Sequence, residues 1–267
     1  MWCELARIAG NDRHYTFVLR GADGKYHRDV EIRLDSVTTI IGDVIAKPQL
    51  VPWAYKVTRD HITGLALHAI EYEMVDEFMD MLTDVDMFAE YMKENRLRPE
   101  DIRDEAAERG QAEHAFLERL ATSALRDEEV AQKIAQRALA DDSATGYTRA
   151  IAGWWLDSNP QVVMTEDVLY SLSGGYAGSV DLVWVDSGGY TILTDLKTGN
   201  AGRKPYSTDH IQVDGYADAY LEMYGERPDR TSVLIAREDG TFTEEYTTLP
   251  EGTFASVLQV YDNLRRG

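Results

Sequence analysis

The pattern of apolar and polar positions divides the chain into a short β-region, a helical middle, and a second half in which strands and helices mix. Up to residue 35, apolar and polar residues alternate on both sides of Gly21-Ala22-Asp23-Gly24, which predicts a β-hairpin. From Ser36 to Ile41 the spacing becomes helical, and a second helix is expected from about residue 51 to past residue 69.

The remaining pattern predicts a fixed order of elements. Helices are expected over 99–124, 127–140 and 145–157, before Asn159-Pro160 ends the helical part. Three strands, a helix, two strands and a closing helix should follow, over 162–170, 175–185, 190–197, 208–224, 231–237, 242–247 and 250–265. This order predicts an α/β fold with a central mixed sheet flanked by helices. We expect one domain over 1–267, with 1–98 as an N-terminal hairpin and helical extension and 99–267 as the core.

Composition excludes several classes of protein. The 47 acidic and 27 basic side chains give a net charge of -20, so a nucleic acid would need a local basic strip or a bound metal. The single cysteine, Cys3, excludes an internal disulfide and a four-cysteine zinc or iron–sulfur site. Because apolar runs are short and neither a leader pattern nor a GxxxxGK[ST] loop is present, we expect a cytoplasmic protein without membrane contact or bound nucleotide.

An acidic stretch over 71–90 contains eight carboxylates and no basic residue. Either a solvated helix face or a partner-docking surface accounts for this composition, and the first is the more common explanation.

The strand expected at 190–197 carries Asp195 and Lys197, which are two residues apart and therefore share a face. Asp181 lies on the preceding strand, and the turn decides whether the two carboxylates meet. A two-residue loop would pair Asp181 with Thr194 and leave Asp195 on the other face. A three-residue loop ending at Gly189 would set Asp181 opposite Asp195, and glycine suits the left-handed position of such loops. We expect this odd loop or an equivalent bulge.

Two directly opposed carboxylates repel each other unless a cation lies between them. Oxygen ligands of this kind suit Mg²⁺ or Mn²⁺. A surface aspartate pair with a salt-bridged lysine is the alternative that these residues leave open.

The helix over 99–124 carries His114 on a face with Gly110 and otherwise small or apolar residues. A glycine inside a helix suggests close approach of another backbone or of a substrate strand. His114 is then either a metal ligand or a satisfied core histidine. Glu118, one turn later, either joins an outer metal shell or faces water.

Other candidates lie on neighbouring elements. Gln212 and Tyr216 share a helix face at i and i+4, where an amide and a phenol could hold a phosphate oxygen, a base edge or the lysine, or could belong to the core. Glu166, on the strand before Asp181, is a candidate metal or outer-shell carboxylate. Arg203 and Lys204 are candidate phosphate contacts, with an ordinary solvated loop as the alternative.

Four motifs together resemble the RecB-type branch of the PD-(D/E)XK nuclease superfamily, in the form common among phage exonucleases and related to CRISPR-associated RecB-like exonucleases. They are Gly-x-x-x-His, Gly-x-x-Asp, Asp-x-Lys and Gln-x-x-x-Tyr, found here as Gly110/His114, Gly178/Asp181, Asp195/Lys197 and Gln212/Tyr216. Residues 36–41 and 47–54 also resemble the region ahead of the core in phage members. Some relatives bind an iron–sulfur cluster through four cysteines, which this chain lacks.

The resemblance implies a restriction-endonuclease-like core and a metal-dependent deoxyribonuclease. His114, Asp181 and Asp195 would hold one Mg²⁺ or Mn²⁺ ion, with the Leu196 carbonyl contributing, and a second ion could join on substrate binding. Lys197 would position or deprotonate the attacking water and stabilise the transition-state charge.

For function, the resemblance implies a DNA exonuclease in which Gln212 and Tyr216 place the scissile strand. It would act on single-stranded or duplex DNA ends during phage recombination, replication or DNA turnover, in the host cytoplasm if the gene belongs to a phage. A recombinase, a single-strand-binding protein or a helicase would be its partner. A flap or nick endonuclease, or a catalytically silent DNA-binding or partner-docking module on the same fold, is the alternative.

Overall fold

The structure is a computed structural model that describes residues 3–10, 13–21, 23, 25–47 and 50–266. The chain divides into two compact units, one formed by Met1–Ile45 with Glu113–Gly267 and the other by Ala46–Ala112. Helix α5 (Pro99–Ala124) contributes residues to both units. The single domain over 1–267, with an extension over 1–98 and a core over 99–267, stays a prediction about domain organisation.

An eight-stranded mixed sheet forms the larger unit, in the order β1-β2-β3-β5-β6-β7-β8 with β4 paired to β5. The strands are β1 (Cys3–Gly10), β2 (His14–Gly21), β3 (Tyr26–Ser36), β4 (Gln161–Ser171), β5 (Tyr176–Val185), β6 (Thr191–Gly199), β7 (Arg230–Arg237) and β8 (Phe242–Tyr246). The pairs β3–β5 and β6–β7 are parallel and the others antiparallel. The mixed α/β sheet expected from the sequence is therefore confirmed.

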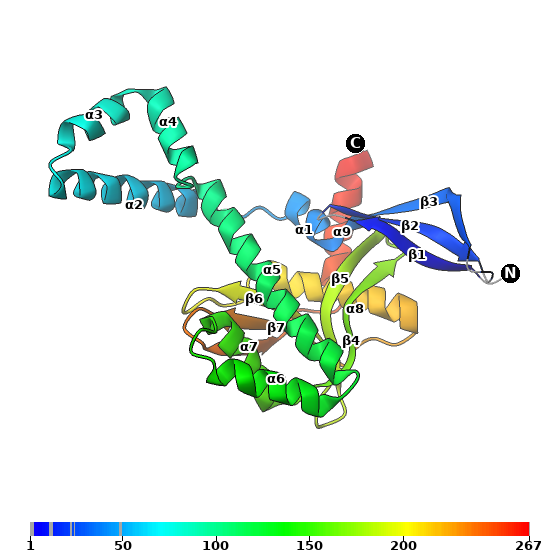
Figure 1. Cartoon of the computed structure of the whole chain (residues 1–267). Coiled ribbons are helices and arrows are strands. Elements are labelled where there is room, and N and C mark those ends of the chain that lie inside the picture. Colours follow the sequence, from blue (N-terminus) through cyan, green and yellow to red (C-terminus); the bar gives the residue numbers. More distant parts are fainter. Residues whose placement is uncertain (1–2, 11–12, 22, 24, 48–49, 267) are drawn as a thin grey trace. The chain divides into compact units, whose positions relative to one another are not determined.

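Helices cover both faces of this sheet (Figure 1). One face packs against α6 (Glu128–Ala140), α7 (Gly146–Ser158) and the end of α5, through Leu117, Trp154 and Trp155 among others. The other packs against α1 (Val37–Val44), α8 (Ser207–Tyr224) and α9 (Thr253–Arg266), through buried apolar side chains that include Ile40 and Phe254. Burial of these large side chains on both faces gives the sheet its main stabilisation.

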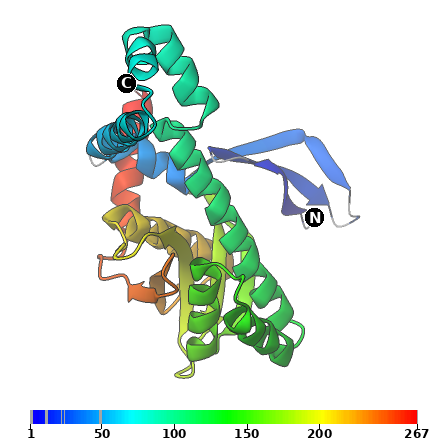
Figure 2. The same cartoon turned by 60° about the vertical axis from the view of Figure 1, so that its left-hand side comes forward.

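The N-terminal strands differ in part from the expected hairpin. Strands β2 and β3 form that hairpin, and β1 adds a third strand that the sequence pattern did not single out (Figure 2). The expected turn includes Ala22 and Gly24, which lie outside the described residues, as do residues 48 and 49 of the segment 47–54 that resembles phage members. Phe17, Leu34 and Ala177 form a small core where these strands join the main sheet.

One edge of β5 is shared by two strands and opens between them. The start of β5 pairs with β3 through Tyr176 and Ala177, whereas its end pairs with β6 from Leu182 onward. On that edge, residues 178–181 pair with neither β3 nor β6. Strand β4 pairs along the opposite edge of β5. This opening, which we call the β5 notch (residues 178–181), creates a place in the sheet where side chains can replace backbone hydrogen bonding.

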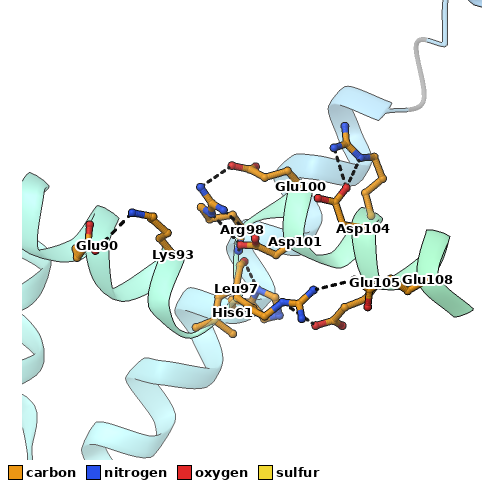
Figure 3. Close-up of polar contacts among 12 residues, drawn as sticks. His61, Glu90, Lys93, Leu97, Arg98, Glu100, Asp101, Asp104, Glu105 and Glu108 are labelled. Carbon is orange, nitrogen blue, oxygen red and sulfur yellow. Dashed lines mark hydrogen bonds and ion pairs between the residues drawn. The ribbon is translucent and has the colours of Figure 1, made fainter. Parts of the chain in front are cut away.

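The smaller unit contains α2 (Leu50–Glu71), α3 (Val75–Thr83), α4 (Val85–Glu94) and the start of α5. His61 Nδ1 lies 2.7 Å from the Leu97 carbonyl oxygen, which ties α2 to the segment between α4 and α5 (Figure 3). Arg98 binds the Asp101 carboxylate with two nitrogens, at 2.8 Å each, and holds the pKa of Asp101 below its usual value.

The acidic stretch over 71–90 lies within this smaller unit, and all eight of its carboxylates are exposed. This exposure agrees with a solvated helix face, the more common explanation of such a composition. Within the described residues, no helix combines the length and apolar character needed to cross a membrane.

Candidate functional site

Strand β6 presents Asp195 and Lys197 together, as their two-residue spacing predicts. Lys197 Nζ lies 2.6 Å from Asp195 Oδ2, and the Asp195 side chain is 3% exposed. Burial raises the pKa of Asp195 to about 6, against the opposing charge of Lys197. Burial alone would lower the pKa of Lys197, but the charges of Asp195 and Asp181 outweigh it and hold that pKa above its usual value. The lysine therefore stays charged at neutral pH.

The turn between β5 and β6 is the three-residue loop that the sequence favoured. Val185 pairs with Thr191, the Asp186 amide donates to the Tyr190 carbonyl at 3.0 Å, and Gly189 has a φ of 81°. The odd loop is confirmed, and its glycine occupies the left-handed position that other residues adopt with difficulty. Because Leu182 pairs with Thr194, continuing this register by one residue sets Asp181 opposite Asp195.

Asp181 occupies the β5 notch instead of pairing through its backbone with β6. Its Oδ2 accepts a hydrogen bond from the Leu196 amide at 2.6 Å, and its Oδ1 lies 3.0 Å from His114 Nδ1 on α5. Both Asp181 and Asp195 are buried, so the alternative of a solvated surface pair does not hold. The carboxylate of Asp181 thus links β6 to α5 at the opening of the sheet.

The electrostatics of the His114 and Asp181 pair follow from burial and proximity. Burial lowers the pKa of His114, but Asp181 outweighs burial and raises that pKa to about 9. Burial likewise raises the pKa of Asp181, but His114 outweighs it and the pKa lies below its usual value. At neutral pH, His114 is therefore protonated and lies beside the ionised carboxylate of Asp181. An ion that used its nitrogen would have to displace this proton.

Gln212 and Tyr216 on α8 reach the same group of side chains. Gln212 Nε2 donates to Asp195 Oδ1 at 2.9 Å and to the Tyr216 hydroxyl at 2.8 Å, while Gln212 Oε1 accepts from Lys197 Nζ at 3.3 Å. The amide therefore fixes the orientation of both members of the ion pair. Gly178 leaves the room that this arrangement needs, because a Cβ there would lie 2.3 Å from Tyr216 Cε1.

Glu166 faces Asp181 from the neighbouring strand. The ladder between β4 and β5 pairs Thr165 with Leu182 and Asp167 with Val180, which sets Glu166 across from Asp181. Its φ of 51° is a left-handed conformation that costs a non-glycine residue about 1–3 kcal/mol. Burial, followed by the charge of Asp181, raises the pKa of Glu166 to about 7.

The donor atoms at the notch fit a hard divalent ion. One ligand atom each from His114, Glu166 and Asp181 lies within 4.8 Å of the other two. Carboxylate oxygens with one imidazole nitrogen suit Mg²⁺ or Mn²⁺ and offer no sulfur to a softer metal. Asp195 borders this group, but Lys197 and Gln212 engage its two oxygens.

Two further predicted residues lie on the elements of the site. Leu196 is fully buried, and its amide is committed to Asp181. Glu118 is exposed on α5, one turn beyond His114, and its charge contributes to the raised pKa of Glu166.

Arg203 and Lys204, the predicted phosphate contacts, differ in their surroundings. Arg203 donates to the Thr198 carbonyl, lies 3.6 Å from Asp209 Oδ2, and has a side chain that is 20% exposed. Lys204 is exposed. Arg203 is therefore already engaged within the protein, and Lys204 is the one whose charge faces solvent.

Two residues that the sequence did not single out support the site. Tyr15 on β2 accepts a hydrogen bond from the Ser179 amide at 3.1 Å, which satisfies part of the notch. Asp209 accepts from the Tyr206 amide at the start of α8, and its charge also contributes to the raised pKa of Lys197. The helix-start pattern of α8 could have indicated Asp209, whereas only the packing of β2 beside β5 brings Tyr15 close.

Comparison with known proteins finds a family match and similar solved structures. Residues 88–264 match the family described as the PD-(D/E)XK nuclease superfamily. No curated protein sequence matches the chain. A solved structure entitled "Crystal structure of SSO0001" is 17% identical, with a TM-score of 0.28 over 42% of this chain and 54% of that chain. The chain thus spans about half the length of that protein.

Proposed function

The chain belongs to the PD-(D/E)XK nuclease superfamily, and from this premise we propose that it is a metal-dependent deoxyribonuclease that hydrolyses phosphodiester bonds at DNA ends. The observation that carries the proposal is the β5 notch, where His114 Nδ1 lies 3.0 Å from Asp181 and Asp181 accepts from the amide of Leu196, the residue between Asp195 and Lys197 on β6. Buried charges of this kind are costly unless they have a task or a partner.

The divalent ion would be held by His114, Asp181 and Asp195, with the Leu196 carbonyl contributing and a second ion joining with the substrate. Mg²⁺ or Mn²⁺ would polarise a phosphate oxygen and lower the pKa of a bound water. Because His114 would supply a nitrogen ligand, we expect Mn²⁺ to support activity at least as well as Mg²⁺. The buried position of Asp181 keeps its carboxylate oriented for this role.

Lys197 supplies a fixed positive charge beside these carboxylates. Its raised pKa makes it suited to stabilising the charge that develops on the phosphate, and to orienting the attacking water. Gln212 holds Lys197 and Asp195 in place, and Tyr216 in turn binds Gln212. These two residues therefore position the reacting groups and the scissile strand.

DNA ends are the proposed substrate because the protein offers no general attraction for a long duplex. A net charge of -20 opposes non-specific binding along DNA, so the strand would be held close to the notch, with Lys204 as a phosphate contact. We therefore propose an exonuclease of the RecB-type branch that acts in phage recombination, replication or DNA turnover. A recombinase, a single-strand-binding protein or a helicase would deliver the end.

The test compares linear duplex DNA, linear single-stranded DNA and covalently closed circular DNA, each incubated with Mn²⁺. We expect progressive shortening of linear DNA, no change in closed circles, and loss of hydrolysis in Asp195→Asn. Asp167→Asn, which removes an exposed carboxylate from β4, is the matched control and should keep the activity. Cutting of closed circles would favour the endonuclease alternative, and binding of DNA without hydrolysis would favour the silent module.

A further inference from the structure

We propose that Tyr15, on strand β2, donates a hydrogen bond from its hydroxyl group to a phosphate oxygen of the DNA strand bound at the β5 notch. Arg7, on strand β1, holds the phenol ring and adds a positive charge beside that strand. The inference rests on the proposed function, since it concerns a contact to the same substrate. Both residues lie outside residues 88–264, the part of the chain that matches the nuclease family, so the family match does not account for them.

Tyr15 reaches the notch from the N-terminal strands. Its hydroxyl oxygen accepts a hydrogen bond from the Ser179 amide at 3.1 Å, and Ser179 belongs to the stretch of β5 that pairs with neither β3 nor β6. Two residues further along β5, Asp181 binds the Leu196 amide through its carboxylate. The phenol and this carboxylate therefore border the same gap in the sheet.

The Tyr15 hydroxyl keeps its own hydrogen available. A phenol oxygen that accepts one hydrogen bond can still donate another, and among the residues that the structure describes, none accepts from this hydroxyl. The bond from the Ser179 amide also polarises the phenol, which makes it a stronger donor. Tyr15 is half-buried, so it is shielded in part from water without being closed off from solvent. A phosphate oxygen, as a charged acceptor, suits such a donor.

Tyr216 connects the Tyr15 phenol to the reacting groups. The Tyr216 hydroxyl accepts from Gln212 Nε2 at 2.8 Å, and the same nitrogen donates to Asp195. Burial raises the pKa of Tyr216, and the charges of Asp195 and Asp181 and the phenol of Tyr15 raise it further. The two phenols are therefore neighbours. A strand that lies along Gln212 and Tyr216 passes within reach of Tyr15.

Arg7 supplies a charge that favours DNA over other ligands. Its guanidinium carbon lies 4.9 Å from the centroid of the Tyr15 ring, within the range at which an aromatic face attracts a cation. The side chain is exposed, and within the described part of the chain it forms no ion pair. In a protein with a net charge of -20, an arginine without a carboxylate partner beside the notch is a local attraction for phosphate.

The test measures single-turnover hydrolysis of linear DNA with Mn²⁺, for three versions of the terminal linkages. One is the ordinary phosphodiester, and the others are the two phosphorothioate diastereomers, in which sulfur, a weak acceptor, replaces one or the other non-bridging oxygen. We expect Tyr15→Phe, which keeps the ring, to slow hydrolysis of ordinary DNA by about 10–100-fold, as loss of a hydrogen bond to a charged group does. Where sulfur replaces the contacted oxygen, the same substitution should slow hydrolysis by less than about 3-fold.

Two further variants separate the contact from its surroundings. Tyr26→Phe is the matched control, because Tyr26 is a phenol of the same strands that also lies beneath an arginine, Arg20, at 5.9 Å, but it is 51% exposed. It should hydrolyse all three substrates like the wild type. Arg7→Gln should weaken binding of a fluorescent oligonucleotide in EDTA, measured by anisotropy, and should lower the salt dependence by about one phosphate contact. Thermal unfolding checks that each variant folds.

The outcomes separate this inference from the proposed function. Equal slowing of all three substrates by Tyr15→Phe would show that the hydroxyl acts only by holding the Ser179 amide, and would overturn the proposal. Hydrolysis at the wild-type rate in Tyr15→Phe would overturn it as well and leave the nuclease standing. An unchanged salt dependence in Arg7→Gln would overturn the role of Arg7. If the wild type hydrolysed none of the linear substrates, the proposed function would fail, and this inference with it.

Discussion

Gly178→Ala tests whether close packing of Tyr216 against β5 determines the geometry of the site. An added Cβ would lie 2.3 Å from Tyr216 Cε1, whereas nine in ten real Cβ contacts are longer than 3.4 Å. The ring must therefore move by 3.4 minus 2.3, or about 1.1 Å, to reach the edge of the ordinary range. Tyr216 is 4% exposed, so its neighbours in the core leave it little space for this movement.

The expected cost combines overpacking with a weakened hydrogen bond. Forcing one extra methyl group into a filled core costs about 1–3 kcal/mol. Movement of the ring also disturbs the 2.8 Å hydrogen bond between Gln212 Nε2 and the Tyr216 hydroxyl, for which about 1 kcal/mol is a typical net value. We therefore expect the free energy of unfolding to fall by about 2–4 kcal/mol.

The assay is urea unfolding of a double-mutant cycle that combines Gly178→Ala with Tyr216→Ala. Without the ring the clash disappears, so the double variant should lose less stability than the sum of the single variants, with a coupling of about 1–3 kcal/mol. Gly42→Ala is the control, because nothing lies within 4 Å of the Cβ position at Gly42 in α1. Strict additivity, or a Gly178→Ala variant as stable as the wild type, would refute the packing argument.

Three other outcomes follow from the contacts of the larger unit. Lys197→Met should lower the free energy of unfolding by about 3–5 kcal/mol at pH 8, since it leaves the Asp195 charge buried without its partner. Because Lys197 lowers the pKa of Asp195, Asp195 in the variant should protonate above pH 6, and the loss should shrink as the pH falls from 8 to 6, as urea titrations at both pH values would show. Protonation of His114, with its pKa raised from 6.5 to about 9, should stabilise the metal-free protein fully below pH 6.5 and lose this effect as the pH rises through 9. Comparison with His114→Gln in EDTA should give a difference of up to about 3 kcal/mol, and a flat difference would contradict the assignment. Trp154→Phe should destabilise the protein by about 1–3 kcal/mol in thermal or urea unfolding, because Glu244 loses the 2.9 Å hydrogen bond from the indole.

Much of the fold was readable because local signals and tertiary packing agree. Pro99 with the acidic residues after it predicted the start of α5, and that helix runs over Pro99–Ala124 as expected. Gly189 predicted the three-residue turn that fixes the register of β5 and β6, and its φ of 81° shows why glycine is needed there. Strand β1 was missed because its partner β2 determines its conformation more than its own alternation does.

The candidate site was readable to a smaller extent. Spacing placed Asp195 with Lys197, and Gln212 with Tyr216, since each pair lies on one element with a known period. No spacing rule relates these pairs to Tyr15 on β2, which reaches Ser179 only because β2 packs beside the notch.

The sequence by itself therefore determined the order of helices and strands from residue 99 onward, favoured the odd turn between β5 and β6, and fixed the residue types of the site, because all three depend on neighbours a few positions apart. Tertiary structure alone decided that β3 and β6 share one edge of β5 and leave the notch between them. It also decided that Glu166 adopts a left-handed backbone opposite Asp181. The physical reason is that hydrogen bonding and charge in a sheet act between strands, where separation in space is independent of separation along the chain.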